Sequence, residues 1–164
     1  MALKSEAYYR SVATTALDRY DVAEPPVPIE ALIASVGVPV RPVNLPAFFT
    51  GAVVSEDGLP VIVINWAKPE PDRRRALAHM LGHVLLMLDD AEYAYPRTIG
   101  DHPDAETVAE ELMMPTKFII EQARLWFNDY RYLARMFGVE EETMLARMRD
   151  LGLVRGPEGV MWDY

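Results

Sequence analysis

Two histidines stand four residues apart in a segment whose sequence is typical of a helix. His79 and His83 lie within residues 73–87, which are rich in alanine and leucine and contain no proline. Residues at positions i and i+4 share one face of an α-helix, so the two imidazoles can bind the same metal ion. The spacing is that of the H-E-x-x-H helices of zinc peptidases, but Met80 stands where the glutamate would be. The pattern predicts a metal site and leaves its chemistry open.

A histidine pair at this spacing also arises by chance in ordinary helices, so the surrounding residues must decide between the two interpretations. Apolar side chains flank the pair on both sides, which indicates a buried helix. Buried imidazoles require polar partners. Gly82 costs a helix about 1 kcal/mol relative to alanine, which favours a second element packed closely against it. This context favours metal binding over a chance pairing.

The composition indicates an ordinary globular protein. Its 164 residues, 51% of them hydrophobic, suffice for one substantial core, so we expect a single domain over residues 1–164. No apolar run approaches the roughly 20 residues of a membrane helix, and residues 1–10 lack an apolar signal segment. The absence of cysteine favours a cytoplasmic protein and excludes thiolate metal sites. A formal net charge of −9 disfavours direct nucleic-acid binding.

The predicted order of elements is helices, then a small sheet, then helices. Helical patterns cover residues 5–20 and 28–36, and β-rich runs cover residues 38–45, 51–55 and 60–66. Further helical patterns cover residues 72–88, 103–112, 116–126, 129–137 and 140–151. Asp72 is the expected N-cap of the histidine-bearing helix, and the apolar run Val61–Ile64 predicts a strand buried on both faces. Segregated helices and strands define the class α+β.

Four stretches of the chain together resemble one known family. They are Ile62–Asn65 before the histidine helix, Arg73–Met87 within it, Asp104–Pro115 with its Leu-Met-Met-Pro end, and Leu133–Leu153. In this order they are similar to the ImmA/IrrE family of zinc metallopeptidases, which carry an IrrE N-terminal-like domain. The resemblance covers residues 28–154. It implies a minimal zincin-like fold, in which a small sheet packs against the motif-bearing helix, further helices follow, and substrate lies along the edge strand.

The resemblance also implies a set of metal ligands. His79 and His83 correspond to zinc ligands, with one zinc ion per chain as the cofactor. The family's third ligand, a glutamate, aligns with His102, and the asparagine or aspartate four residues later aligns with Glu106. Three imidazoles and one water form a good tetrahedral zinc site, so His102 is the expected third ligand, placed at a helix cap by Pro103. Glu106 remains the alternative third ligand, or a partner that orients an imidazole.

Met80 occupies the position of the family's general base. There a glutamate takes a proton from the attacking water and passes it to the leaving amine, which a thioether cannot do. General acid–base catalysis contributes about 10²–10⁴-fold, so we expect peptidase turnover to be impaired or lost. The sequence is equally compatible with a degenerate family member and with a deliberate replacement. A substitute base or oxyanion donor would have to come from the following loop and helix start: Asp89, Asp90, Glu92, Tyr93, Tyr95, Asp101 or Asp104.

Three functions are compatible with these features. The resemblance implies a zinc metallopeptidase-like protein that acts on a helix-turn-helix transcriptional regulator. The alternative is a non-catalytic module that grips an extended peptide segment of a regulator by β-augmentation. Residues 133–153 also have the helix–glycine–helix spacing of a DNA-binding motif, but three glutamates at positions 140–142 would face the phosphates there. A protein partner is therefore expected, with neither a membrane nor nucleic acid as a binding partner.

Overall fold

Seven helices and three strands make up the described part of the computed structural model, which comprises residues 3–96 and 100–154. The class is α+β, as predicted. The chain divides into two units, of which unit 1 combines residues 1–22 with 28–112 and unit 2 combines residues 23–27 with 113–164. A single domain over the whole chain remains a prediction.

Unit 1 contains the sheet and the helices that surround it. Its elements are α1 (Glu6–Arg19), α2 (Ile29–Val36), β1 (Val40–Val43), β2 (Gly51–Glu56), β3 (Leu59–Asn65), α3 (Glu70–Asp89) and all but the last residue of α4 (Pro103–Met113). The strand order is β1-β3-β2, with β1 parallel and β2 antiparallel to the central β3. Asp57 and Gly58, both with positive φ, form the two-residue turn between β2 and β3. β1 and β2 are therefore the two edge strands, one on each side of β3.

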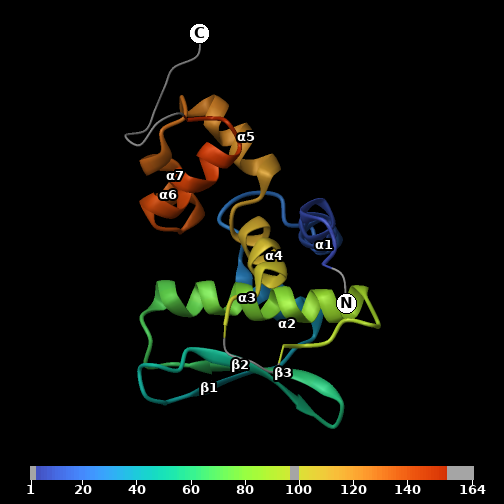
Figure 1. Cartoon of the computed structure of the whole chain (residues 1–164). Helices are drawn as coiled ribbons and strands as arrows, with labels where there is room; N and C mark the ends of the chain where they lie inside the picture. The colour runs from blue at the N-terminus through green and yellow to red at the C-terminus, as the bar shows by residue number, and fades with distance from the viewer. Residues whose placement is uncertain (1–2, 97–99, 155–164) are drawn as a thin grey trace. The chain divides into compact units, whose positions relative to one another are not determined.

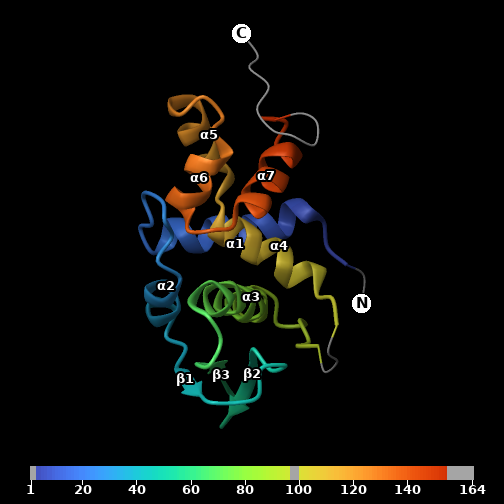
Figure 2. The same ribbon diagram turned by 90° about the vertical axis from the view of Figure 1, so that its left-hand side faces the viewer.

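The helix α3 lies across one face of the sheet, and α1 and α4 lie on the side of α3 away from the sheet (Figures 1 and 2). This central position explains why α3 is buried almost continuously from Leu77 to Leu86. On the sheet, Ile62 and Ile64 are fully buried beneath it. The histidine helix is thus enclosed by other elements, as its apolar flanks predict.

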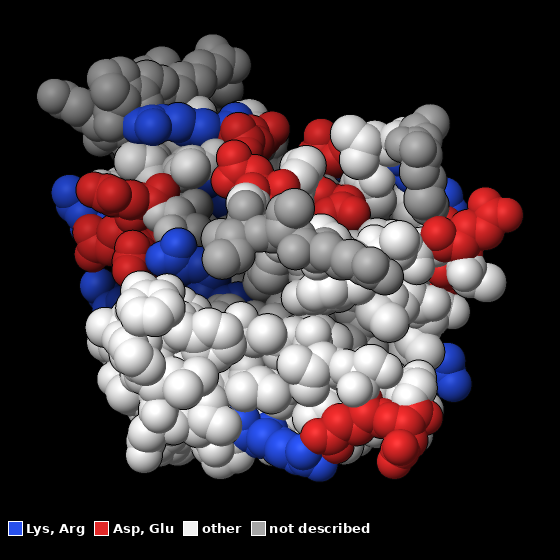
Figure 3. All heavy atoms as spheres, turned by 60° about the horizontal axis from the view of Figure 1, so that its bottom comes forward, with Lys and Arg blue, Asp and Glu red and all other residues white. Residues whose placement is uncertain are grey.

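The opposite face of the sheet carries no helix among the described residues of unit 1 (Figure 2). Figure 3 shows this face as largely uncharged, with acidic and basic side chains at its margins. Val63 on this face is only half-buried, so the prediction of a strand buried on both faces is wrong for this residue. Val61, which the alternation of a strand places on the same face, is 3% exposed, so the prediction is confirmed for the rest of the run.

The start of α3 also differs from its prediction. The cap is Pro69 and the helix begins at Glu70, with Pro71 in the first turn. Proline is favoured there because its missing N–H would have no partner in the helix. Asp72 is therefore not the N-cap but lies within the first turn. In that turn its negative charge interacts favourably with the positive end of the helix dipole.

A buried asparagine holds the loop between β1 and β2 in place. The Asn65 side chain is fully buried, and its amide donates to the carbonyl oxygens of Leu45, Pro46 and Phe49 at 2.9, 3.2 and 2.7 Å. Its carbonyl oxygen accepts from the backbone N–H groups of Leu45 and Ala67. These bonds fix the point where β2 begins, beside the histidine helix.

Unit 2 is a helical assembly with its own buried side chains. It contains α5 (Thr116–Leu125), α6 (Tyr130–Phe137) and α7 (Glu141–Asp150). Gly138 ends α6 with φ 68°, and Phe137, Met144 and Met148 are fully buried. The buried Arg147 donates to Oγ1 of Thr116 at 2.7 Å. In the described residues of both units, no helix is long and apolar enough to cross a membrane.

Candidate metal centre

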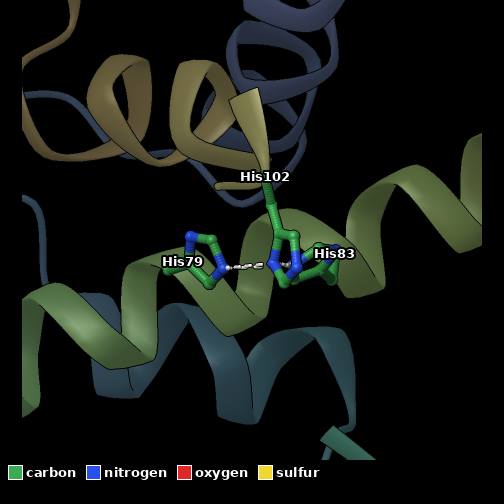
Figure 4. Close-up of side chains that lie close together, drawn as sticks. All are labelled: His79, His83 and His102. Atoms are coloured by element: carbon green, nitrogen blue, oxygen red, sulfur yellow. Dashed lines mark hydrogen bonds between the residues drawn. The ribbon is translucent and has the colours of Figure 1, made fainter. Parts of the chain in front are cut away.

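The three histidines of the chain meet at one point, although His102 lies 19 residues beyond His83 in the sequence. His79 and His83 project from successive turns of α3, and His102 reaches them from the residue before α4 (Figure 4). Nε2 of His83 lies 3.1 Å from Nε2 of His79 and 3.1 Å from Nδ1 of His102. Nε2 of His79 and Nδ1 of His102 are 3.3 Å apart. One ring nitrogen of each histidine thus faces a common centre.

These separations fit a metal ion. Nitrogen ligands about 2.0–2.1 Å from a tetrahedral zinc ion lie about 3.3–3.4 Å from one another. The three observed separations, 3.1, 3.1 and 3.3 Å, fall within a few tenths of an ångström of this geometry. Three neutral nitrogen donors are also a donor set that zinc accepts, with the fourth position left open. The residues present therefore fit the cofactor that the family resemblance implies.

The environment keeps His83 neutral, the form that a metal ligand requires. Its side chain is fully buried. Burial, followed by the proximity of His79 and His102, lowers the pKa of His83 to about 3. The lone pair of one ring nitrogen is consequently available at neutral pH.

Glu106 stands behind His79 and outside the group of three nitrogens. Its Oε1 lies 2.7 Å from Nδ1 of His79, on the opposite side of the ring from the shared centre. The approach is not aligned as a regular hydrogen bond, since the buried Nδ1 has no aligned partner among the described atoms. The contact with His79 nevertheless lowers the pKa of the Glu106 carboxyl. This placement suits a carboxylate that orients an imidazole.

Tyr93 contacts His83 from the other direction. Its hydroxyl lies 2.7 Å from Nδ1 of His83, the ring nitrogen that points away from the shared centre. The sequence suggested Tyr93 only as an oxyanion donor, because a loop tyrosine gives no local signal of a histidine partner. Tyr95 packs its ring on His83 with centroids 4.5 Å apart, while its hydroxyl accepts from the N–H of Val53 at 3.5 Å.

Two of the loop acids considered as substitute bases are bound elsewhere. Asp89 accepts a hydrogen bond from the hydroxyl of Tyr8, and Asp90 forms an ion pair with Lys4 at 2.7 Å. These contacts join the end of α3 to the start of α1. Neither carboxylate is part of the histidine group.

Met80 points toward the edge strand β2. Its side chain is buried, and a Cβ atom on Gly51 would lie 2.7 Å from its Cε and 3.0 Å from its Sδ. It lines an open cleft of ≈ 420 Å³ beside the metal centre. The other lining residues are Thr50, Gly51, Lys68, Asp72, Arg75, Ala76, His79 and Glu106. A thioether therefore borders the cleft beside the three histidines.

Gly82 is the point of closest approach between α3 and α4. A Cβ atom at this position would lie 2.8 Å from the carbonyl oxygen of Ala105. The predicted close packing against this glycine is confirmed. The contact brings the start of α4, with His102 before it, down onto the histidine face of α3.

A histidine helix laid across a small mixed sheet, with three imidazoles converging beside it, defines a zincin-like fold with a candidate metal centre. The family model of the IrrE N-terminal-like domain (Peptidase_M78) matches residues 34–149, and the chain belongs to this family. It is also similar to the structure of a Mycobacterium tuberculosis transcriptional regulator, with a TM-score of 0.62 and 18% sequence identity. That match covers 93% of this chain and 49% of the regulator, so the chain spans about half the length of that protein and shares its fold. No curated protein sequence matches the chain significantly.

Proposed function

We propose that the protein binds one zinc ion through His79, His83 and His102, and that its peptidase activity is impaired or lost. The observation that supports the site is the convergence of three imidazole nitrogens at 3.1–3.3 Å. The observation that supports impaired hydrolysis is Met80, which borders the cleft where a general base is needed.

The side chains around the centre suit binding better than proton transfer. A bound zinc ion would polarise a peptide carbonyl as a Lewis acid. The carboxylate of Glu106, 2.7 Å from Nδ1 of His79, favours a proton on that nitrogen by its charge, which leaves Nε2 free to bind the metal. Met80 borders the cleft but cannot accept a proton from water there. The proposed site therefore retains the three imidazoles that would hold a metal and lacks the carboxylate that would act as general base.

The alternative function is a binding module for a peptide segment of a transcriptional regulator. The N–H of Asn65 donates to the carbonyl of Thr50, so the alternating pattern of an antiparallel pair turns the backbone groups of Gly51, Val53 and Ser55 outward. The other edge strand carries Pro42, which has no N–H to donate. The outward backbone groups of Gly51 and Ser55 thus support strand addition beside the cleft, whereas the N–H of Val53 already donates to the hydroxyl of Tyr95. The similar structure is that of a transcriptional regulator. The family resemblance implies a helix-turn-helix regulator as the partner, so such a regulator is a suitable first partner to test.

Metal analysis tests the site directly. We expect about one zinc per chain in the purified or zinc-supplemented protein, and loss of that zinc in His79→Ala and His102→Ala. Glu106→Gln should retain stoichiometric zinc at lower affinity, because the three imidazoles remain but the negative charge beside Nδ1 of His79 is lost. A protein without stoichiometric zinc after supplementation would refute the site, and Glu106→Gln without zinc would make Glu106 a ligand.

The two functions are separated by what happens to the partner. Incubation of the zinc-loaded protein with helix-turn-helix regulators, followed by gel filtration and mass spectrometry, should recover a regulator intact if the protein only binds. Metal-dependent fragments produced by the unmodified chain would show that another base operates and would support the enzyme.

A further inference from the structure

The cleft beside the three histidines carries two cations that the proposed metal site does not use. Lys68 and Arg75 line this cleft of ≈ 420 Å³ together with Gly51 and Met80. Lys68 lies between β3 and α3 and is half-buried, whereas Arg75 is exposed on α3. Within residues 3–96 and 100–154, neither cation forms an ion pair with a carboxylate. Each can therefore pair with a carboxylate of a bound molecule.

Two carboxylates also line the cleft, but other groups of the protein partly offset their charges. Oε1 of Glu106 lies 2.7 Å from Nδ1 of His79, and after His79 the guanidinium of Arg75 also contributes to the lowered pKa of this carboxyl. Asp72 lies in the first turn of α3, where the positive end of the helix dipole interacts with it. Lys68 has no such ionic partner among the described residues. The cleft can consequently accept a further negative charge.

The edge strand β2 determines which part of a bound peptide enters the cleft. A Cβ atom on Gly51 would point at the side chain of Met80, which lines the cleft. Directly opposite residues of neighbouring strands place their side chains on the same face of a sheet. A peptide strand added along β2 therefore directs the side chain opposite Gly51 toward Met80. That side chain enters the space that Lys68 and Arg75 line.

We propose that the cleft takes an acidic side chain of the bound peptide, and that Lys68 and Arg75 are the residues that select it. This inference rests on the proposed binding of a peptide along β2. A carboxylate accepts charge-assisted hydrogen bonds from an ammonium and from a guanidinium. A glutamine side chain lacks the attraction between opposite charges, and a lysine side chain is repelled by both cations. The partner therefore carries glutamate or aspartate at the position opposite Gly51.

The test uses peptides that differ at one position. Short fluorescein-labelled peptides of alternating valine and threonine carry glutamate, glutamine or lysine at the centre. Fluorescence anisotropy at low salt measures their affinities for the zinc-supplemented protein. We expect the glutamate peptide to bind about 4- to 25-fold more tightly than the glutamine peptide, since each exposed ion pair contributes about two- to fivefold. The lysine peptide should bind most weakly, and added salt should reduce the differences.

Charge substitutions test whether these two cations are responsible. In Lys68→Gln and in Arg75→Gln, affinity for the glutamate peptide should fall about two- to fivefold, and affinity for the glutamine peptide should not change. Lys117→Gln is the matched control, because Lys117 is exposed on α5 and its replacement changes the net charge equally. Chelator competition should give each variant the zinc affinity of the unmodified protein, which separates peptide selection from damage to the fold or to the metal site.

The possible outcomes separate this inference from the proposed zinc site. Equal affinity for the glutamate and glutamine peptides, or a preference that survives replacement of both Lys68 and Arg75, would overturn the inference and leave peptide binding intact. Failure of all three peptides to bind would overturn it together with the binding module, while metal analysis still judges the zinc site. Acid-selective binding by a protein that holds no zinc would support the inference and refute the zinc site.

Discussion

A methionine side chain is about as long as that of glutamate but carries no group that can accept a proton. Because of this similar length, Met80 is buried against Gly51 and α3 remains regular around the two histidines. In the proposed function, metal binding depends on the imidazoles, whereas hydrolysis would depend on a carboxylate that Met80 does not supply. The two properties are therefore separable by a single substitution.

Met80→Glu should raise metal-dependent peptidase activity by about 10²–10⁴-fold, the usual contribution of general acid–base catalysis. The glutamate would reach the cleft that Met80 borders and could act on water there. The measurement is cleavage of a mixture of unfolded peptides by the zinc-loaded variant, followed by mass spectrometry. Met80→Gln is the matched control, because it has the same length and polarity without a titratable group. Equal gains in both variants would show that space or polarity, and not proton transfer, limits the reaction.

The contact between α3 and α4 positions the third histidine. Gly82 allows the carbonyl of Ala105 to approach closer than a side chain would permit. His102 lies directly before α4, and its carbonyl accepts the first helical hydrogen bond from the N–H of Glu106 at 2.9 Å. Any movement of α4 away from α3 consequently moves a ligand away from the centre.

Gly82→Ala should destabilise the metal-free protein by about 1–3 kcal/mol, because the added methyl group overpacks a backbone contact. The same variant should bind zinc more weakly, since α4 must shift with His102. Urea unfolding and chelator competition measure the two effects. Gly100→Ala is the control for stability, because a Cβ atom there meets no atom of the described residues within 4 Å and the position has no positive φ. A Gly82→Ala variant as stable as Gly100→Ala would show that α4 is not held where the structure places it.

The two units raise the question of whether the chain unfolds as one. The family match spans residues 34–149 and therefore includes parts of both units. The three proposed metal ligands belong to unit 1. Zinc stabilises directly only the structure that holds its ligands, so its effect on unfolding reports how the units are coupled.

If the chain is a single domain, calorimetry should show one transition, and zinc should raise its midpoint. Zinc at about 1,000 times its Kd stabilises by about 4 kcal/mol, which corresponds to an increase on the order of 10 °C for a domain of this size. A chelator should reverse the increase. Two resolved transitions, of which zinc shifts only one, would contradict the single-domain prediction and identify unit 2 as an independently unfolding part.

Local sequence was sufficient for most elements of the fold. Ser5 and Asp129 accept hydrogen bonds from the N–H groups they cap, and Gly37 and Gly138 end their helices in the left-handed conformation, as their types predict. These interactions involve residues only a few positions apart, so sequence patterns reveal them. The four-residue spacing of the histidine pair belongs to the same class of signal.

Tertiary structure decided which residues complete the site. His102, Glu106 and Tyr93 reach the histidine pair only because α4 packs at Gly82 and the segment after α3 returns to the helix, and neither event leaves a periodic pattern in the sequence. The same holds for Val63, whose partial exposure depends on which face of the sheet the helices cover. Convergence of distant side chains follows from the packing of whole elements, whereas the spacing of His79 and His83 follows from the pitch of one helix.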